Sequence, residues 1–356
     1  MTAVVEIDPS RSREWDEFVA THPRGQIYHL SGWKTVLETC FPHIRGHLLA
    51  AVDGPGRRIE AGFPIYEVRS WLLGTRLISS PFATISDPLA ESPEVLAPLI
   101  ERVKAMSKSK NARAIEFRTS EAAHCFEGSG FGEARYFVNH VIDLNPPIDA
   151  LWKSFHRSCV RQRIARAESS GIEIRTGRDG SDLRAFHGLL SMTRRRRSLP
   201  AQPYRFLEAL WSVFYPNGRI RLLLAEREGR TAAGLLLFVF RDRVTAEFLG
   251  SDDSFKAASP VHALFWSAIK WAHAEGYRFF DLGRTSPANR SLLEFKGHWG
   301  TSAKELPQFF YPPSLASGVS RFETSWKYRL AKSMTSPRAP QAVYEWMGSL
   351  TYLLPR

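Results

Sequence analysis

Lys296, Asp281 and Arg284 are the residues whose types and spacing first suggest chemistry. Asp281 and Arg284 flank Gly283 at the end of a predicted strand, where side chains of α/β sheets commonly reach a ligand. The carboxylate could accept a proton or orient a nearby lysine, and the guanidinium could bind a phosphate or carboxylate bidentately. Lys296 lies in the apolar stretch LLEFKGHWG. The alternatives are a structural ion pair and a lysine whose stem covers aromatic rings.

Two clusters of arginine could bind anions. Arg157 and Arg161 are spaced i,i+4 in one predicted helix, so that both lie on one face. Two guanidinium groups there suit a diphosphate or a nucleic-acid backbone, and a solvated helix face is the alternative. Arg194 to Arg197 form an unbroken block, which we expect in a loop between two helices. That loop could cover a cleft, contact nucleic acid or simply lie on the surface.

Four further residues are candidates to bind a ligand. Trp33 and Lys34 could line the first half's side of a cleft, although Trp33 also suits a core position. Arg118 stands in EFRTS as Arg284 stands in DLGRTS. Asn289 could cap a helix as readily as it could contact a ligand.

The elements that must position these residues occur twice along the chain. HLLAAVDGPGRRIEAGFPIYEV (His47–Val68) and LLLAEREGRTAAGLLLFVF (Leu222–Phe240) each read as strand, turn and strand, with Ala-Gly opening the second strand. Each is followed, at nearly the same interval, by a helix-like run and a strand that ends in Arg-Thr-Ser. A duplication implies two similar α/β units, with a cleft between them as the natural ligand site. The alternative is chance, since this order of elements is common.

We therefore predict an α/β (α+β) fold of two tandem domains, each a mixed sheet flanked by helices. The consecutive prolines of Asn145-Pro146-Pro147 indicate the boundary. The predicted domains are 1–145 and 146–312, followed by a basic and helical tail, 313–356. Helices are expected over 149–170 and 181–192.

The composition describes a well-packed protein with a surplus of positive charge. The 356 residues are 44% hydrophobic, and 48 Lys and Arg against 36 Asp and Glu give a net charge of +12. Such a surplus favours anionic partners. Three widely spaced cysteines argue against disulfides and against a zinc site, and the scattered histidines show no metal-ligand spacing with a nearby acid. From the cysteine and histidine spacing we expect an enzyme without a metal. We also expect it to be cytoplasmic, since no apolar run approaches the roughly 20 residues of a membrane span and the N-terminus does not resemble a secretory signal.

Four stretches, which together span about residues 15–310 and so most of the chain, resemble the Fem-like (FemAB-type) branch of the GNAT acyltransferase superfamily. They are DLGRTSPANRSLLEFKGHWG (Asp281–Gly300), QIYHLSGWKTVL (Gln26–Leu37), RSCVRQRIARAESSGIEI (Arg157–Ile174) and TRRRRSLPAQPYRFLEAL (Thr193–Leu210). The Phe295-Lys296…Trp299-Gly300 element is the most specific of them. Members of this branch carry two GNAT-like domains in tandem, as the duplication suggests here.

The resemblance implies transfer of an acyl or aminoacyl group to an amine. This reaction passes through a tetrahedral oxyanion, which needs a positive charge where the negative charge develops. In the Fem-like pattern the lysine of the Phe-Lys pair lies at the tRNA-end or carbonyl site, so Lys296 is expected to be the electrostatic stabiliser. Asp281 is its expected catalytic partner, and Phe295 and Trp299 are expected to contact substrate. The first domain has no Phe-Lys pair, so the second should carry the chemistry.

One feature of ordinary GNAT acetyltransferases is missing. They hold the pyrophosphate of acetyl-CoA in a glycine-containing turn at a helix N-terminus, where backbone N–H groups converge. The matching segment here, SDDSFKAASPVH (Ser251–His262), has no glycine and carries two adjacent carboxylates. The counterpart in the first domain, SSPFATISDPLA, lacks the turn too. This weakens an acetyl-CoA donor without excluding it.

The leading hypothesis is an acyl or aminoacyl transferase that acts on an amine of a cell-envelope or exopolysaccharide precursor. The expected donor is aminoacyl-tRNA or acyl-CoA, with no tightly bound cofactor. A GNAT-type acyl-CoA N-acetyltransferase is one alternative. The other is a non-catalytic basic protein that binds RNA or a membrane, and peripheral contact with the inner membrane face stays open in either case.

Overall fold

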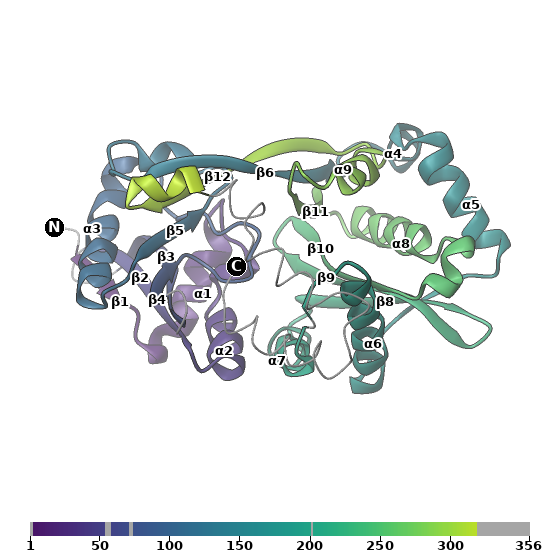
Figure 1. The fold of residues 1–356 in the computed structure, drawn as a ribbon, viewed down its shortest axis with the longest axis horizontal. Coiled ribbons are helices and arrows are strands. Elements are labelled where there is room, and N and C mark those ends of the chain that lie inside the picture. Colours follow the sequence, from purple (N-terminus) through teal and green to yellow (C-terminus); the bar gives the residue numbers. More distant parts are fainter. Residues whose placement is uncertain (1–2, 54–57, 71–73, 201, 319–356) are drawn as a thin grey trace. The chain divides into compact units, whose positions relative to one another are not determined.

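The computed structural model describes residues 3–53, 58–70, 74–200 and 202–318. Most of the expected basic tail, from residue 319 onward, lies outside the described residues. Contacts divide the chain into two compact units. The first contains residues 1–136 together with the segment that begins at Glu305, and the second contains Phe137–Lys304 (Figure 1).

The first unit is a mixed sheet with the strand order β1-β2-β3-β4-β5-β12. These strands are β1 (Ala3–Glu6), β2 (Ile44–Asp53), β3 (Arg58–Ser70), β4 (Gly74–Ile78), β5 (Ala114–Arg118) and β12 (Ser302–Tyr311). Its helices are α1 (Ser12–Thr21), α2 (Ser31–Cys40) and α3 (Pro93–Ser109). Neighbouring strands from β1 to β4 are antiparallel, whereas β4 and β5 are parallel, so α3 is a βαβ crossover.

The second unit repeats this arrangement with the strand order β7-β8-β9-β10-β11-β6. These strands are β7 (Glu173–Thr176), β8 (Ile220–Arg227), β9 (Arg230–Phe240), β10 (Arg243–Ser251), β11 (Phe279–Thr285) and β6 (Gly132–Asp143). Its helices are α4 (Ile148–Ser154), α5 (Gln162–Ser169), α6 (Gly180–Arg196), α7 (Tyr204–Phe214), α8 (Pro260–Ala274) and α9 (Arg290–Gly297). The parallel pair is β10–β11, joined by α8.

Corresponding glycines confirm the likeness of the two units. A Cβ on Gly62 of β3 would lie 2.7 Å from the Trp15 ring of α1. A Cβ on Gly234 of β9 would lie 2.6 Å from the Phe186 ring of α6. In each unit, therefore, a glycine in the second strand of the repeated strand pair (β3 or β9) leaves room for an aromatic side chain. That side chain comes from a helix, α1 or α6, that precedes the pair in the sequence.

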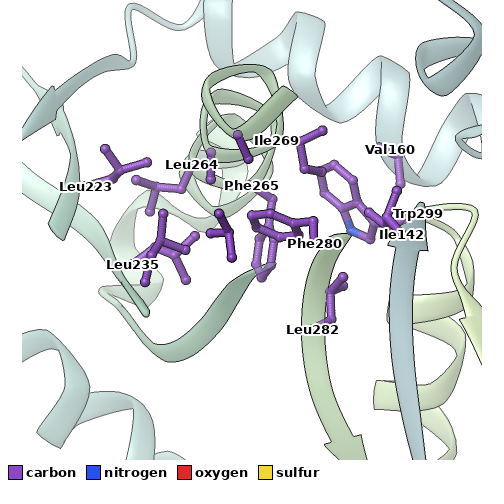
Figure 2. Packing of buried hydrophobic residues seen from close by; sticks show 14 of the residues in the cluster. Ile142, Val160, Leu223, Leu235, Leu264, Phe265, Ile269, Phe280, Leu282 and Trp299 are labelled. Atoms are coloured by element: carbon purple, nitrogen blue, oxygen red, sulfur yellow. The ribbon is translucent and has the colours of Figure 1, made fainter. Parts of the chain in front are cut away.

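The opposite face of each sheet forms the main apolar core. Alternate residues of a strand point to opposite faces, and the neighbours of these glycines pack with the crossover helices. Phe63 packs in a cluster with Leu99 of α3. Leu235 packs in a cluster with Leu264 and Phe265 of α8 (Figure 2).

Each unit receives its last strand from the other part of the sequence. β12 follows β11 along the chain, yet it pairs with β5, and its Phe309 stacks on Phe126 of the first unit's core at 4.2 Å between ring centroids. β6 follows β5, yet it pairs with β11, and its Ile142 lies in the second unit's core (Figure 2). The division by contacts therefore falls inside β6 and β12, whereas the predicted boundary at 145/146 follows β6.

Two predicted helices differ from those observed. The single helix expected over 149–170 is interrupted, because Phe155 is buried in an extended conformation after α4. His156 then caps a π-helical turn, Arg157–Arg161, that runs into α5. The other difference is in α6, which continues to Arg196, so three arginines of the block predicted as a loop belong to its last turn. Among the described residues, no helix combines the length and apolar composition that a membrane crossing requires.

Candidate active site

Asp281 forms the fixed centre of the candidate site in the second unit. It lies on β11 with only 4% of its surface exposed. Its Oδ2 accepts hydrogen bonds from Arg243 Nη1 at 2.9 Å and Asn139 Nδ2 at 3.1 Å. Its Oδ1 accepts one from the Gly283 N–H at 2.7 Å. Three donors, one of them the Arg243 guanidinium, therefore hold both carboxylate oxygens in place. This arrangement suits a positioning residue, and the predicted role as a proton acceptor has no support in these contacts.

The hydrogen bond from Gly283 belongs to a break in the β11 ladder. The pairing of β11 with β6 shifts register between Asp281 and Arg284, and Gly283 adopts a φ of 73°. A positive φ is accessible to glycine at no steric cost. The bulge turns the carbonyl groups of residues 283 and 284 toward α9, the helix that carries Lys296.

Lys296 donates two hydrogen bonds to these carbonyl groups. Its Nζ lies 2.7 Å from the Gly283 oxygen and 3.2 Å from the Arg284 oxygen. Only 6% of the residue is exposed. Burial lowers the pKa of Lys296 from 10.5 to about 8, an effect that Asp281 opposes and Arg197 reinforces. The ammonium therefore stays mainly protonated at neutral pH, and two of its three N–H groups are used.

The remaining predicted residues of this region have three different structural roles: one stacks on an aromatic ring, one caps a helix, and two pack in the apolar core. The Arg284 guanidinium lies over the Phe137 ring, 4.5 Å from its centroid. Asn289 caps α9, because its side chain accepts from the Leu292 N–H. Trp299 is fully buried in the apolar cluster of the second unit (Figure 2), and Phe295 packs beside it at 6.3 Å between ring centroids. The predicted substrate contact of Trp299 is thus replaced by a core position that holds α9 in place.

Arg157 and Arg161 both belong to the π-helical turn rather than to one long α-helix. Arg157 is exposed and Arg161 is half-buried. No side-chain partner holds the Nε of Arg161 within the part of the chain that the structure describes. Neither residue contacts the Asp281–Lys296 group in any described hydrogen bond or ion pair.

The three candidates in the first unit have structural partners there. Trp33 is fully buried and packs edge-on against Tyr28 at 4.9 Å between ring centroids, so it is a core residue. Lys34 pairs with Glu38 at 2.7 Å along α2. Arg118 is 3% exposed and donates to Glu116 and to the Ala83 carbonyl. Burial thus removes Trp33 and Arg118 from the residues that could meet a ligand in this conformation.

Sequence reasoning missed two residues that act on the site, and it named a third, Arg197, only as part of the arginine block. Asn139 and Arg243 complete the bonds of Asp281, and Arg197 lies close enough for its charge to lower the pKa of Lys296. Asn139 lies in the FVNHVIDL strand, but nothing in that pattern shows that this strand pairs with β11. Arg243 would have been found only by aligning β10 with β11.

The segment that would correspond to a pyrophosphate-binding turn is unsuited to that task. Ser251–Ser259 contains a 3-10 helix, Asp253–Ala258, and α8 begins with Pro260, which has no N–H to donate. Asp252 caps the 3-10 helix, and Asp253 pairs with Arg196 at 3.0 Å. A bound pyrophosphate would need several backbone N–H groups that point toward it. This segment has carboxylates and a proline at those positions instead.

Comparisons with known proteins agree on the type of fold. Residues 154–296 match the family described as acetyltransferase (GNAT) domain. The chain is 24% identical over 312 residues to the UDP-N-acetylmuramoylpentapeptide-lysine N(6)-alanyltransferase of Weissella viridescens, a match that covers 81% of this chain and 89% of the relative. The crystal structure of FemX superposes with a TM-score of 0.72 at 16% identity, over 89% of this chain and 99% of that one.

A third comparison bears on the repeat. The tandem GNAT protein from the clavulanic acid biosynthesis pathway superposes with a TM-score of 0.53 at 10% identity, over 87% of this chain and 98% of that one. The two units described above are therefore GNAT-like domains in tandem. At these identities the solved structures establish the fold alone.

Proposed function

We propose that this chain, which is similar to Fem-type proteins of the GNAT superfamily, transfers an aminoacyl group from a charged tRNA to an amine of a cell-envelope precursor. The single observation that carries the mechanism is Lys296, a buried ammonium with two N–H groups fixed by backbone carbonyls. The relative from Weissella viridescens, whose name describes alanyl transfer to the lysine of a UDP-N-acetylmuramoylpentapeptide, supports the substrate class.

Lys296 serves the step in which charge develops. The neutral acceptor amine attacks the ester carbonyl of the aminoacyl group, and its carbonyl oxygen becomes an oxyanion. The third N–H of Lys296 donates to that oxygen in a site from which water is largely excluded. The C–O ester bond then breaks, an amide remains, and the proton of the amine passes to the departing ribose oxygen.

Asp281 acts through Lys296 in this scheme. Its negative charge raises the pKa of Lys296 against the effect of burial and so keeps the ammonium protonated. Its bond to the Gly283 N–H holds the bulge whose carbonyl groups orient the ammonium. Arg284, half-buried beside Phe137, is a candidate to bind a phosphate or carboxylate of the substrates.

The donor is proposed to be tRNA rather than CoA. The β10–α8 segment offers carboxylates and a proline in place of a pyrophosphate turn. The exposed Arg157 and half-buried Arg161 supply positive charge of the kind that contacts a nucleic-acid backbone. Contacts of this kind weaken as salt rises, because counterions compete for the phosphates.

The test measures transfer of a radiolabel to purified acceptor by the full-length protein. One reaction contains tRNA charged with labelled alanine and UDP-N-acetylmuramoyl-pentapeptide, and a parallel reaction contains labelled acetyl-CoA. Label should reach the acceptor only from the charged tRNA. Transfer from acetyl-CoA alone would replace this proposal by the acetyltransferase alternative. Salt-sensitive tRNA retention, without transfer from either donor to peptide or saccharide acceptors, would favour the non-catalytic alternative.

A further inference from the structure

His156, Cys159 and His298 converge in the second unit, although the sequence separates His298 widely from the other two. Each offers one nitrogen or sulfur atom, and these three atoms all lie within 4.8 Å of one another. His156 is exposed, while Cys159 and His298 are partly buried. The group lies beside the site described above and takes no part in its hydrogen bonds.

Backbone contacts hold the three residues in register. The His156 N–H donates to the His298 carbonyl at 2.9 Å, and the two imidazole rings lie 4.7 Å apart between centroids. The Cys159 N–H donates to Nδ1 of His156 at 3.2 Å. The cluster is therefore built from two fixed chain segments, the turn before α5 and the end of α9.

We propose that His156, Cys159 and His298 form a binding site for Zn²⁺ or a similar thiophilic divalent ion. Imidazole and thiolate are the ligands that zinc prefers, with metal–nitrogen bonds of about 2.0–2.1 Å and metal–sulfur bonds of about 2.3 Å. Ligand atoms around a tetrahedral ion of that size lie roughly 3.4–3.6 Å apart. The three ligand atoms lie within 4.8 Å of one another, so side-chain rotations would have to bring them closer to reach that range.

The chemistry of binding balances within the site. The Cys159 thiol releases its proton when its sulfur binds the ion. Coordination through Nδ1 of His156 replaces a hydrogen bond of 3.2 Å and leaves the ring proton on the other nitrogen. The fourth tetrahedral position stays open to water. Arg157 and Arg161 belong to the same turn, and their charge makes the site weaker than one surrounded by carboxylates.

The consequence is a clamp between two elements of the second unit. His298 follows α9, two residues after Lys296, and the other two ligands belong to the turn that leads into α5. The ion would fix the end of α9 to that turn and so stabilise the second unit. This role does not depend on which group the enzyme transfers.

The experiment uses the full-length protein after dialysis against a chelator. Co²⁺ is added first, because cobalt bound to a thiolate gives a near-ultraviolet charge-transfer band, and Zn²⁺ is then titrated in competition with a fluorescent chelator. We expect the band with the wild type and its displacement by Zn²⁺. The band should vanish in Cys159→Ser. Loss of a residue that only hydrogen-bonds to a metal ligand weakens metal binding by about 10- to 100-fold. His298→Gln removes a ligand itself, so it should weaken Zn²⁺ binding by more than that.

Cys125→Ser is the matched control, since Cys125 lies in the first unit and should leave the band unchanged. Circular dichroism shows whether each variant folds. A wild type that binds neither ion overturns the proposal. A band that survives in Cys159→Ser, or Zn²⁺ affinity equal in all variants, shows an adventitious surface ion only and overturns it as well.

Discussion

At the scale of single residues, a substitution of Lys296 is expected to lower the transferase activity while leaving the stability of the fold nearly unchanged. Lys296→Met keeps most of the apolar stem and removes the charge, so kcat/KM should fall by about 10²- to 10³-fold, as for the loss of one oxyanion donor. The thermal midpoint should not fall by more than a few degrees, because burial disfavours the charged form of this lysine. Lys270→Met is the control, since Lys270 is exposed on α8. Equal activity of both variants would contradict the assigned role.

Asp281 should give the opposite pattern. Asp281→Asn leaves the Arg243 guanidinium without its charge partner, so the free energy of unfolding should fall by about 3 kcal/mol, the usual range for breaking a buried pair. Some transferase activity should remain in the folded fraction, since Lys296 still donates to the same carbonyls. Urea unfolding and activity per folded molecule measure the two effects. A stable variant with no activity would instead restore the role of proton acceptor.

At the scale of secondary-structure elements, Gly234 is expected to be needed for the fit of α6 against β9. Gly234→Ala forces the Phe186 ring away from a Cβ at 2.6 Å and should cost about 1–3 kcal/mol of unfolding free energy. Gly188→Ala is the matched control on α6, where an added Cβ meets nothing within 4 Å. It should stabilise the helix by about 0.5–1 kcal/mol. Equal thermal midpoints for the two variants would show that the close contact between residue 234 and the Phe186 ring does not affect stability.

His29 should make the first unit sensitive to acid. It is fully buried, with hydrogen bonds to the Gln26 N–H and the Asp87 carbonyl, and burial lowers the pKa of His29 from 6.5 to about 4. The unfolded chain therefore binds more protons between these values, so stability falls as pH falls through that window. The loss from His29 should be about 1.6 kcal/mol between pH 6.5 and pH 5.

His29→Gln tests this assignment, because glutamine keeps an acceptor and a donor but does not titrate in this range. Urea unfolding of both proteins at pH 6.5 and pH 5 gives the comparison. The variant should lose less stability than the wild type, by about the amount assigned to His29. His140 and His262 also have pKa values lowered to about 4 in the second unit, so part of the acid sensitivity should remain. Identical losses in both proteins would exclude His29 as a source.

At the scale of the whole molecule, local sequence patterns predicted the repeated unit but could not predict how the units share strands. Apolar runs on either side of a glycine-containing turn specify β2–β3 and β8–β9, because the two strands of each pair are close in sequence and the turn sets their pairing. The position of Lys296 near the end of β11 was predictable, because the Phe-Lys element and the end of that strand can both be recognised from short stretches of sequence. Asn139 reaches Asp281 only because β6 pairs with a strand far away in sequence, and no local pattern encodes that choice.

The same strand exchange predicts how the protein responds to being cut. A fragment of residues 1–145 contains β5 but lacks β12, so it loses a ladder of hydrogen bonds and the Phe309 ring from its core. It should be insoluble or unfolded when expressed alone, since an unpaired apolar strand edge favours aggregation. A fragment of residues 146–356 lacks β6 and should fail in the same way. Co-expression should restore both missing strands, so the two fragments should co-purify and unfold cooperatively. A soluble 1–145 fragment with its own cooperative unfolding transition would show that the exchanged strands are dispensable, and that the domain boundary lies at the prolines after all.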